Sequence, residues 1–364
     1  MNKLLMLVTL LVLTACSQTS DCACENEPMI GPSYQDQQAF EALIQYFANE
    51  VKKEWGESNY LEASKHHYVK YIDGYRTRAH IDFDKGKIYV STVDRHRPQQ
   101  SLRYAIIETL LMSSDPSKVD LFSDAKLPLS GKPFLMGQVV DHEGHTIEWQ
   151  WRAQRFADYL LTHKLHRQQQ AGTSVHYVEI DMVRDHLAQR EYQYAHLIRA
   201  ASQRYGIGED LIYAIIKTES SFNPYAVSHA GAYGLMQVMP KTAGADVFAL
   251  VKGRSGVPSR AYLFDPANNI DTGVAYFQLL KQRYLKGISH PTNLHYSMIS
   301  AYNGGAGGVL STFNRDRKRA VKDINGLQPQ QLYWALTTRH PKAEARRYLQ
   351  KVVKFQQAFN QGQL

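Results

Sequence analysis

The sequence predicts an α+β protein in which a small mixed α/β domain precedes an all-helical domain. A chain of 364 residues is long enough for two domains of about 150 residues each. Residues 37–165 mix helical and alternating apolar patterns, whereas beyond residue 190 the apolar spacing is helical almost throughout. With 44% hydrophobic and 21% charged residues, the composition excludes a largely disordered chain and a multi-span membrane protein.

The first residues are typical of a bacterial export signal. Lys3 precedes ten nearly uninterrupted apolar residues, LLMLVTLLVL, about half of the ~20 that a transmembrane helix needs. The next residues, Leu13-Thr14-Ala15-Cys16, resemble the lipobox, in which the cysteine is lipidated and begins the mature chain. We therefore expect a lipoprotein signal peptide at 1–15 and a lipidated, flexible tether at 16–36. An ordinary signal peptide with a free Cys16 is the alternative.

The residues around Cys16 also indicate a location. Ser17, rather than an aspartate, follows Cys16, and this favours anchoring in the outer membrane with the protein facing the periplasm. Cys22 and Cys24 are too close in the chain for an unstrained disulfide. We therefore expect no disulfide to hold either domain.

The net charge points to an acidic partner. Removal of Lys3 with the signal peptide changes the formal charge from +8 to +7. Anionic lipid headgroups and the carboxylate-bearing cell wall both fit this charge, whereas nucleic acid is the least expected partner of an exported lipoprotein. A basic surface that only keeps the chain soluble is the alternative. We expect the chain to act as a monomer.

Residues 37–185 are predicted to form the mixed domain. Apolar residues at helical spacing indicate a first helix that ends near Gly56. The stretch RAHIDFDKGKIYVSTV at 78–93 is typical of a β-hairpin, and LMGQVVDHEGHTIEWQW at 135–151 indicates a second one that turns at Gly144. The other expected elements are helices at 101–112 and 151–165, a linker at 166–174, and at 175–182 a strand that could join the same sheet.

Three polar residues in the second expected hairpin raise the question of a metal site. His142 and His145 could share one face of a helix and, with Glu143, bind a metal ion. However, this stretch is predicted to be a turn, and no further ligand is indicated nearby. We expect solvated turn residues here, and neither a metal nor a cofactor in the protein.

A glutamate interrupts the apolar pattern in the helical domain, predicted at 190–360. The segment EDLIYAIIKTESSFNP is expected to form a helix in which Glu219 shares the stripe of Ile212, Ile215 and Ile216. Burial and the helix C-terminus both disfavour a negative charge, so they should raise the pKa of Glu219, as suits a general acid. Alternatively, the carboxyl turns out to solvent at a frayed helix end.

The sequence around and after Glu219 carries a series of motifs. They are ESSFNPYAVSHAGAYGLMQVMP from residue 219, SAYNGG from residue 300 and AEARRYLQKVVKF from residue 343. Together they resemble the catalytic signatures of the lytic transglycosylases, whose catalytic domain has a lysozyme-like, SLT-type fold. The resemblance covers about residues 190–360, and the expected lipobox and mixed first domain are similar to those of one membrane-bound branch.

The resemblance implies functions for residues in the first motif. Glu219 corresponds to the single catalytic acid and base, and Ser228 to a serine that hydrogen-bonds the substrate near the reacting sugar. In GLMQ, Gly234 permits close approach of the backbone, Met236 packs against a sugar ring and Gln237 lines the cleft beside Leu235. The structural alternatives are a turn hydroxyl for Ser228 and core packing for Met236.

The later motifs imply further substrate-binding residues. Ala301, Tyr302 and Asn303 match the third motif, which places Tyr302 near Glu219 and the scissile bond. Tyr348 corresponds to the tyrosine of the fourth motif, which is matched more loosely. Tyr302 could equally end a core helix, and Tyr348 lies on an apolar stripe that suits a purely structural residue.

The family implies cleavage of the β-1,4 bond between N-acetylmuramic acid and N-acetylglucosamine in peptidoglycan, with 1,6-anhydromuramyl ends as product. Glu219 would act first as acid and then as base, without a metal or a cofactor. Two alternatives remain. A hydrolytic muramidase would need a second carboxylate, with Asp246, Asp265 and Asp271 as candidates, and a non-catalytic lipoprotein would only bind the wall.

Overall fold

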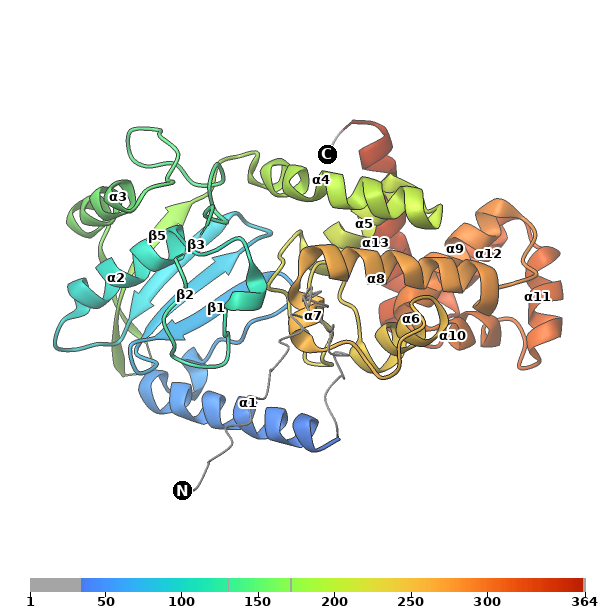
Figure 1. Ribbon diagram of the computed structural model, residues 1–364, viewed down its shortest axis with the longest axis horizontal. Coiled ribbons are helices and arrows are strands. Elements are labelled where there is room, and N and C mark those ends of the chain that lie inside the picture. Colours follow the sequence, from blue (N-terminus) through green and yellow to red (C-terminus); the bar gives the residue numbers. More distant parts are fainter. Residues whose placement is uncertain (1–33, 130, 171, 363–364) are drawn as a thin grey trace, which may run out of the picture.

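The structure, a computed structural model, describes residues 34–129, 131–170 and 172–362. The expected signal peptide, Cys16 and residues 16–33 of the expected tether lie outside these residues. Two parts lie side by side in Figure 1, a sheet with α1–α3 and the helices α4–α13. Among the described residues, no helix is both long and apolar enough to cross a membrane.

One antiparallel sheet forms the centre of the amino-terminal part. Its strand order is β1-β2-β3-β5-β4. The register pairs Ala79 with Val90 and Ile88 with Ile180, so alternate side chains face the core. The strands are β1 His67–Ile72, β2 Thr77–Asp82, β3 Lys87–Thr92, β4 His166–Gln170 and β5 Thr173–Asp181.

Helices surround the sheet and make up the rest of the chain. In the amino-terminal part they are α1 Tyr34–Trp55, α2 Pro98–Leu110 and α3 Gln150–His163, with the 3₁₀ turns η1 Glu57–Asn59 and η2 Pro116–Lys118. The second part contains α4 His186–Tyr205, α5 Glu209–Ser220, α6 Ala245–Leu250, α7 Arg260–Phe264, α8 Pro266–Leu279, α9 Pro291–Gly304, α10 Ala306–Ser311, α11 Arg317–Asn325, α12 Pro329–Thr338 and α13 Ala343–Asn360, with the π-helical turns η3 Pro240–Gly244 and η4 Leu280–Tyr284.

The first expected hairpin and the strand expected at 175–182 are confirmed as β2–β3 and β5. The expected helices at 101–112 and 151–165 correspond to α2 and α3. The linker expected at 166–174 is wrong, because β4 pairs with β5 there. β4 is an edge strand with mostly exposed side chains, so its polar composition concealed it.

The second expected hairpin is also wrong. Only an isolated bridge between Val140 and Thr146 forms around the turn at Gly144. The Asp141 carboxylate accepts hydrogen bonds from the backbone N–H groups of Glu143 and His145, at 3.0 and 2.9 Å. These bonds stabilise a compact loop in place of a strand ladder.

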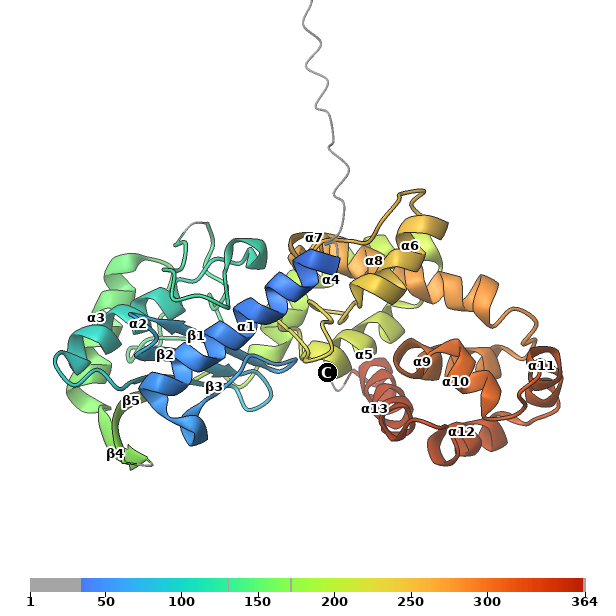
Figure 2. The same cartoon turned by 90° about the horizontal axis from the view of Figure 1, so that it is seen from below.

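The two parts share a continuous hydrophobic core. Tyr225, from the loop after α5, is fully buried against rings of the amino-terminal part, with ring centroids 5.2 Å from Tyr68 and 5.5 Å from Phe134. Its hydroxyl donates a hydrogen bond to the Ser113 carbonyl. In addition, α1 runs beneath the sheet and its first turns approach the segment before α7 (Figure 1, Figure 2). These contacts place residues of both parts around the end of α5.

Candidate functional site

Glu219 lies in the last turn of α5 and is buried. Its side chain is 5% exposed, on the same stripe as Ile212, Ile215 and Ile216, which are fully buried. The helix ends at Ser221, whose backbone is left-handed at φ 50°. A carboxyl at this position is withdrawn from water and faces the negative end of the helix dipole.

Three neighbouring side chains act on the Glu219 carboxyl besides burial itself. Burial has the largest effect and raises its pKa; the Lys65 ammonium and the Tyr348 hydroxyl lower it, and the negative charge of Glu344 raises it. The result is a pKa above the ordinary value for glutamate. Lys65 Nζ lies 3.0 Å from Glu219 Oε2 and comes from the amino-terminal part of the chain, just before β1.

The GLMQ motif forms a tight loop held by a buried asparagine. Asn269, on α8, donates to the carbonyls of Tyr233 and Leu263 at 2.7 Å and accepts from the N–H of Met236 at 2.8 Å. Gly234 has φ 72°, and a Cβ there would lie 2.4 Å from Asn269 Nδ2. A glycine is therefore required at this point of the loop. Asn269 lies outside the motifs and was not identified from the sequence.

The side chains of the GLMQ loop differ in their surroundings. Leu235 and Met236 are fully buried, and the Met236 side chain packs in the core beside Gly273. Gln237, in the left-handed region at φ 49°, donates from Nε2 to the carbonyls of Ala226 and Gly234. Its buried Oε1 has no hydrogen-bond partner among the described residues.

Tyr302 on α9 joins the GLMQ loop to the site. Its hydroxyl donates to the Met236 carbonyl at 2.8 Å, and its ring stacks on Phe277 with centroids 4.5 Å apart. Burial raises its pKa far above the usual tyrosine range, and the charge of Glu219 adds to this shift. Beside it, Ala301 is buried, and Asn303 Nδ2 donates to Glu344 Oε1 at 3.3 Å.

Tyr348 lies on α13, which packs against α5, and its side chain is buried. Burial, followed by the charge of Glu219, raises its pKa far above the usual range, and a hydrogen bond between the Tyr348 hydroxyl and the Glu219 carboxyl adds to this shift. Glu219, Tyr302 and Tyr348 thus come together from α5, α9 and α13. One buried polar atom of the GLMQ loop, Gln237 Oε1, has no partner among the described protein groups and is available to a ligand.

Ser228 lies in the turn that precedes the GLMQ loop, where its backbone N–H donates to the Ala232 carbonyl at 3.0 Å. Its hydroxyl accepts a hydrogen bond from the Ala232 N–H at 3.0 Å, as a turn serine does. It lines a cavity of about 890 Å³ that is bounded by α1, by Glu62 and Ala63, and by the segment before α7. Glu219 is not among the described residues that line this cavity.

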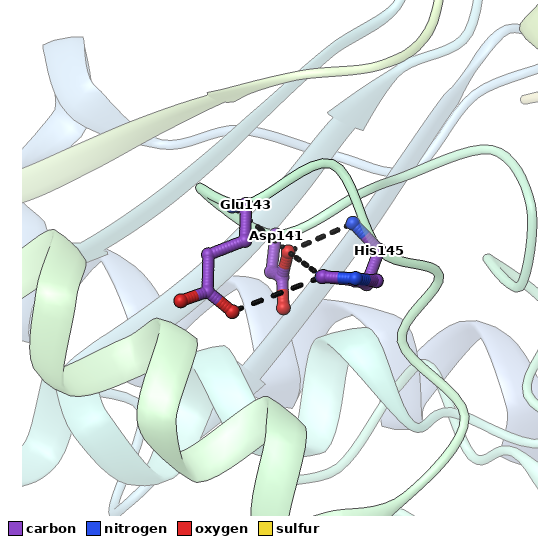
Figure 3. A group of neighbouring side chains, drawn as sticks. All are labelled: Asp141, Glu143 and His145. Atoms are coloured by element: carbon purple, nitrogen blue, oxygen red, sulfur yellow. Dashed lines mark hydrogen bonds and ion pairs between the residues drawn. The ribbon is translucent and has the colours of Figure 1, made fainter.

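The polar loop after residue 140 gathers three potential metal ligands, Asp141, Glu143 and His145 (Figure 3). Both carboxylates already have cationic partners: Asp141 Oδ2 accepts from Arg152 at 2.6 Å, and Glu143 accepts from Arg155. Arg152 helps to hold the pKa of Asp141 low, at about 2, together with backbone hydrogen bonds. The cluster is explained by these ion pairs and by the turn that Asp141 caps.

Residues outside the motifs also hold the end of α5, and no pattern in the sequence indicates them. Lys65 and His66 lie in a short polar stretch, ASKHH, with no periodicity. Arg190 is fully buried on α4 and donates to the Ser221 and Phe83 carbonyls at 3.2 and 3.0 Å. Because an arginine in a helix is normally expected on the exposed face, the local sequence does not indicate that Arg190 is buried.

The helical part of the chain belongs to the class of transglycosylase SLT domains. The family model of the transglycosylase SLT domain matches residues 196–325, and the model of the N-terminal domain of membrane-bound lytic murein transglycosylase C matches residues 33–193. Curated proteins named membrane-bound lytic murein transglycosylase C are 49% identical in Sodalis glossinidius, over 99% of both chains, and 49% identical in Klebsiella pneumoniae, over 96% of both. The chain belongs to the membrane-bound lytic murein transglycosylase C family.

Among solved structures, the 70 kDa soluble lytic transglycosylase of Escherichia coli is 26% identical to this chain. The match covers 49% of this chain and 26% of that one, with a TM-score of 0.36.

Proposed function

We propose that the protein is a lytic transglycosylase that cleaves the β-1,4 bond between N-acetylmuramic acid and N-acetylglucosamine in peptidoglycan and leaves 1,6-anhydromuramyl ends. Family membership supports the enzyme class. The observation that supports the mechanism is the burial of one carboxyl, Glu219, with a raised pKa at the junction of three helices. A carboxyl that keeps its proton can donate it to a leaving group.

The reaction needs one residue in two protonation states. Glu219 gives its proton to the glycosidic oxygen as the bond from that oxygen to the anomeric carbon breaks. The substrate N-acetyl group and the nearby Tyr302 phenol stabilise the positive charge that develops on the sugar. The Glu219 carboxylate then takes the proton of the muramyl 6-hydroxyl as its oxygen bonds to the anomeric carbon. The nucleophile belongs to the substrate, so the protein supplies proton transfer and orientation.

The remaining motif residues are proposed to bind the glycan. Gln237 Oε1 is a buried polar atom without a partner among the described residues, so a substrate hydroxyl or amide would satisfy it. The Tyr348 hydroxyl, which contacts Glu219, is proposed to contact the sugar beside that carboxyl. The proposed contacts through the backbone or through side chains at the rim are Gly234, Leu235, Met236, Ala301, Asn303 and Ser228. For Met236 we propose a contact through its backbone, because its side chain is buried.

The hydrolytic alternative needs a second carboxylate opposite Glu219. Asp246, Asp265 and Asp271 each have another partner: Asp246 accepts from Tyr284, Asp265 caps α8, and Asp271 pairs with Lys252 at 2.6 Å. Glu344 is close enough to influence Glu219, but it is exposed and accepts from Asn303. These partners favour the transglycosylase.

Digestion of purified peptidoglycan sacculi tests the mechanism. We expect the parent protein to release fragments whose mass is lower by one water than hydrolysed ones, and Glu219→Gln to release none. Glu209→Gln, at the first turn of the same helix, is the matched control and should remain active. Glu344→Gln should still form the anhydro product. Equal solubilisation by the parent and Glu219→Gln would exclude Glu219 as the acid.

We also propose that lipid at Cys16 anchors a monomer in the outer membrane, facing the periplasm, with domains at 37–185 and 190–360. The family name, which includes the term membrane-bound, supports membrane association. Labelling of cells with a radioactive fatty acid, with Cys16→Ala as control, tests the anchor, and sucrose-gradient fractionation tests the membrane. An unlabelled parent protein would refute the anchor.

A further inference from the structure

The segment before β1 crosses from the sheet part to the end of α5. Within it, Lys65 contacts the second part through both its side chain and its backbone. Its Nζ donates to Glu219 Oε2 at 3.0 Å, and its carbonyl accepts from Asn223 Nδ2 at 3.2 Å. The Lys65 side chain is 32% exposed and that of Glu219 is 5% exposed. The ammonium therefore lies between solvent and the buried carboxylate.

The next residue fixes the same segment independently. His66 Nδ1 lies 3.0 Å from Ser221 Oγ, and the Ser221 hydroxyl donates to the Asp84 carboxylate. The His66 ring and the Ser221 hydroxyl both help to lower the pKa of Asp84. The backbone carbonyl of Ser221 is in turn held by buried Arg190. Lys65 is thus presented to Glu219 by a segment with several anchors, which favours one fixed position for its ammonium.

Other charged or titratable groups also face Glu219. They come from α9 and α13: Tyr302, Tyr348 and Glu344. None of these three supplies a positive charge. Lys65 therefore supplies the positive charge that, with the hydrogen bond from Tyr348, favours the ionised carboxylate against burial and Glu344.

This inference rests on the proposed function. We propose that Lys65 is a positioning residue for the acid–base step, supplied by the amino-terminal domain to the active site of the helical domain. After Glu219 has passed its proton to the leaving sugar oxygen, the ammonium holds the carboxylate in place and in its ionised form. The carboxylate then accepts the proton of the 6-hydroxyl as the new oxygen–carbon bond forms, which restores the acid. No proton is gained or lost by Lys65.

The physical reason is that one carboxyl has to serve opposite tasks. Burial alone favours the protonated acid and would make the carboxylate a costly intermediate. A partly exposed ammonium at 3.0 Å offsets part of that cost without abolishing the raised proton affinity. Catalytic groups work best when their pKa lies near the working pH. The amino-terminal domain thereby takes part in the reaction chemistry.

The first test measures the titration of Glu219 itself, without turnover. The full chain is labelled with ¹³C at glutamate side-chain carboxyls, and the resonance of residue 219 is assigned with Glu219→Gln. In Lys65→Met we expect its titration midpoint to rise by about 1 pH unit or more, the usual effect of removing an opposite charge at this distance. Lys65→Arg should keep a midpoint close to that of the parent.

Lys85→Met is the matched control. Lys85 lies in the same domain and pairs with Asp82 at 3.3 Å, with a side chain that is 74% exposed. Its removal changes the net charge equally and should leave the Glu219 midpoint unchanged. Because the Lys65 side chain is partly exposed, Lys65→Met is expected to fold; Lys65→Gln repeats the test with a polar side chain.

The second test is the pH dependence of kcat/KM on solubilised glycan strands. The fall of kcat/KM at high pH, where Glu219 loses its proton, should shift to higher pH in Lys65→Met by the same number of pH units as the titration midpoint. Lys65→Arg should restore the parent profile. A purely structural Lys65 would lower activity by one factor at every pH. An unchanged midpoint in Lys65→Met, or an equal shift in Lys85→Met, overturns the proposal. Full activity of Glu219→Gln would instead refute the proposed function.

Discussion

Arg190 provides a sharp test of how the two parts are held together. It is fully buried on α4, and Arg190→Ala would remove its hydrogen bonds, among them the three to the carbonyls of Ser221 and Phe83 and to Gln138 Oε1 at 2.9 Å. Each buried acceptor left without a donor costs about 1–3 kcal/mol. The buried guanidinium itself is costly, since burial lowers the pKa of Arg190 to about 10, and its removal regains part of this free energy.

We therefore expect Arg190→Ala to reduce the free energy of unfolding by about 3–5 kcal/mol. Urea denaturation followed by tryptophan fluorescence measures this as a shift of the midpoint at constant slope. Arg199→Ala, on the same helix, is the control: Arg199 is 64% exposed and lies 3.9 Å from Glu209, so its loss should change stability by less than about 0.5 kcal/mol.

A loss below about 1 kcal/mol in Arg190→Ala would refute the argument that these three bonds hold the junction. A loss of the expected size should also reduce cleavage of sacculi, because Ser221 ends the helix that carries Glu219.

Three other predictions concern the site. The raised pKa of Glu219 contributes stability that is complete below the unfolded pKa of 4.5 and is lost as the pH rises through the folded pKa. Calorimetry should therefore show that the Tm of Glu219→Gln increases relative to that of the parent between about pH 4 and about pH 7. A Tm difference that is constant over this range would contradict the argument. In Gly234→Ala the backbone has φ 72° and the new Cβ lies 2.4 Å from Asn269 Nδ2, so the free energy of unfolding should fall by at least about 1–2 kcal/mol and most of the activity should be lost. An unchanged Tm would refute this clash. Tyr302→Phe removes the hydrogen bond to the Met236 carbonyl, so urea denaturation should show a free energy of unfolding lower by about 1–3 kcal/mol, and kcat should fall. A kcat equal to that of the parent would exclude a role for the phenol in the reaction.

The course of the chain through the amino-terminal sheet illustrates which elements local patterns identify. The alternating apolar residues Ala79, Ile81, Ile88 and Val90 identified β2 and β3, because these four side chains share one face of the sheet and are buried in the core. β4 was mistaken for a linker, because an exposed edge strand buries little and its polar residues resemble those of a loop. The loop at 135–151 was mistaken for a hairpin, because the Asp141 carboxylate binds backbone groups that an alternating pattern would assign to a ladder.

In the candidate site, too, some features could be predicted from local sequence patterns and others could not. The spacing of Ile212, Ile215, Ile216 and Glu219 predicts a carboxyl on the buried stripe of a helix, and this carboxyl is buried. The motif match predicts Tyr302 near it, and the two groups influence each other electrostatically. The first prediction relies on helix geometry over a short interval of the chain, whereas the second is what the resemblance to the family's motif implies.

The sequence by itself determined that a carboxyl lies on the buried face of a helix, because periodicity and local spacing are properties of short segments. Only the tertiary structure decided the charge beside that acid. Lys65 precedes Glu219 by 154 positions and meets it because the sheet domain docks on the end of α5. Docking depends on the packing of Tyr225 and the buried bonds of Arg190, and neither leaves a periodic trace in the sequence.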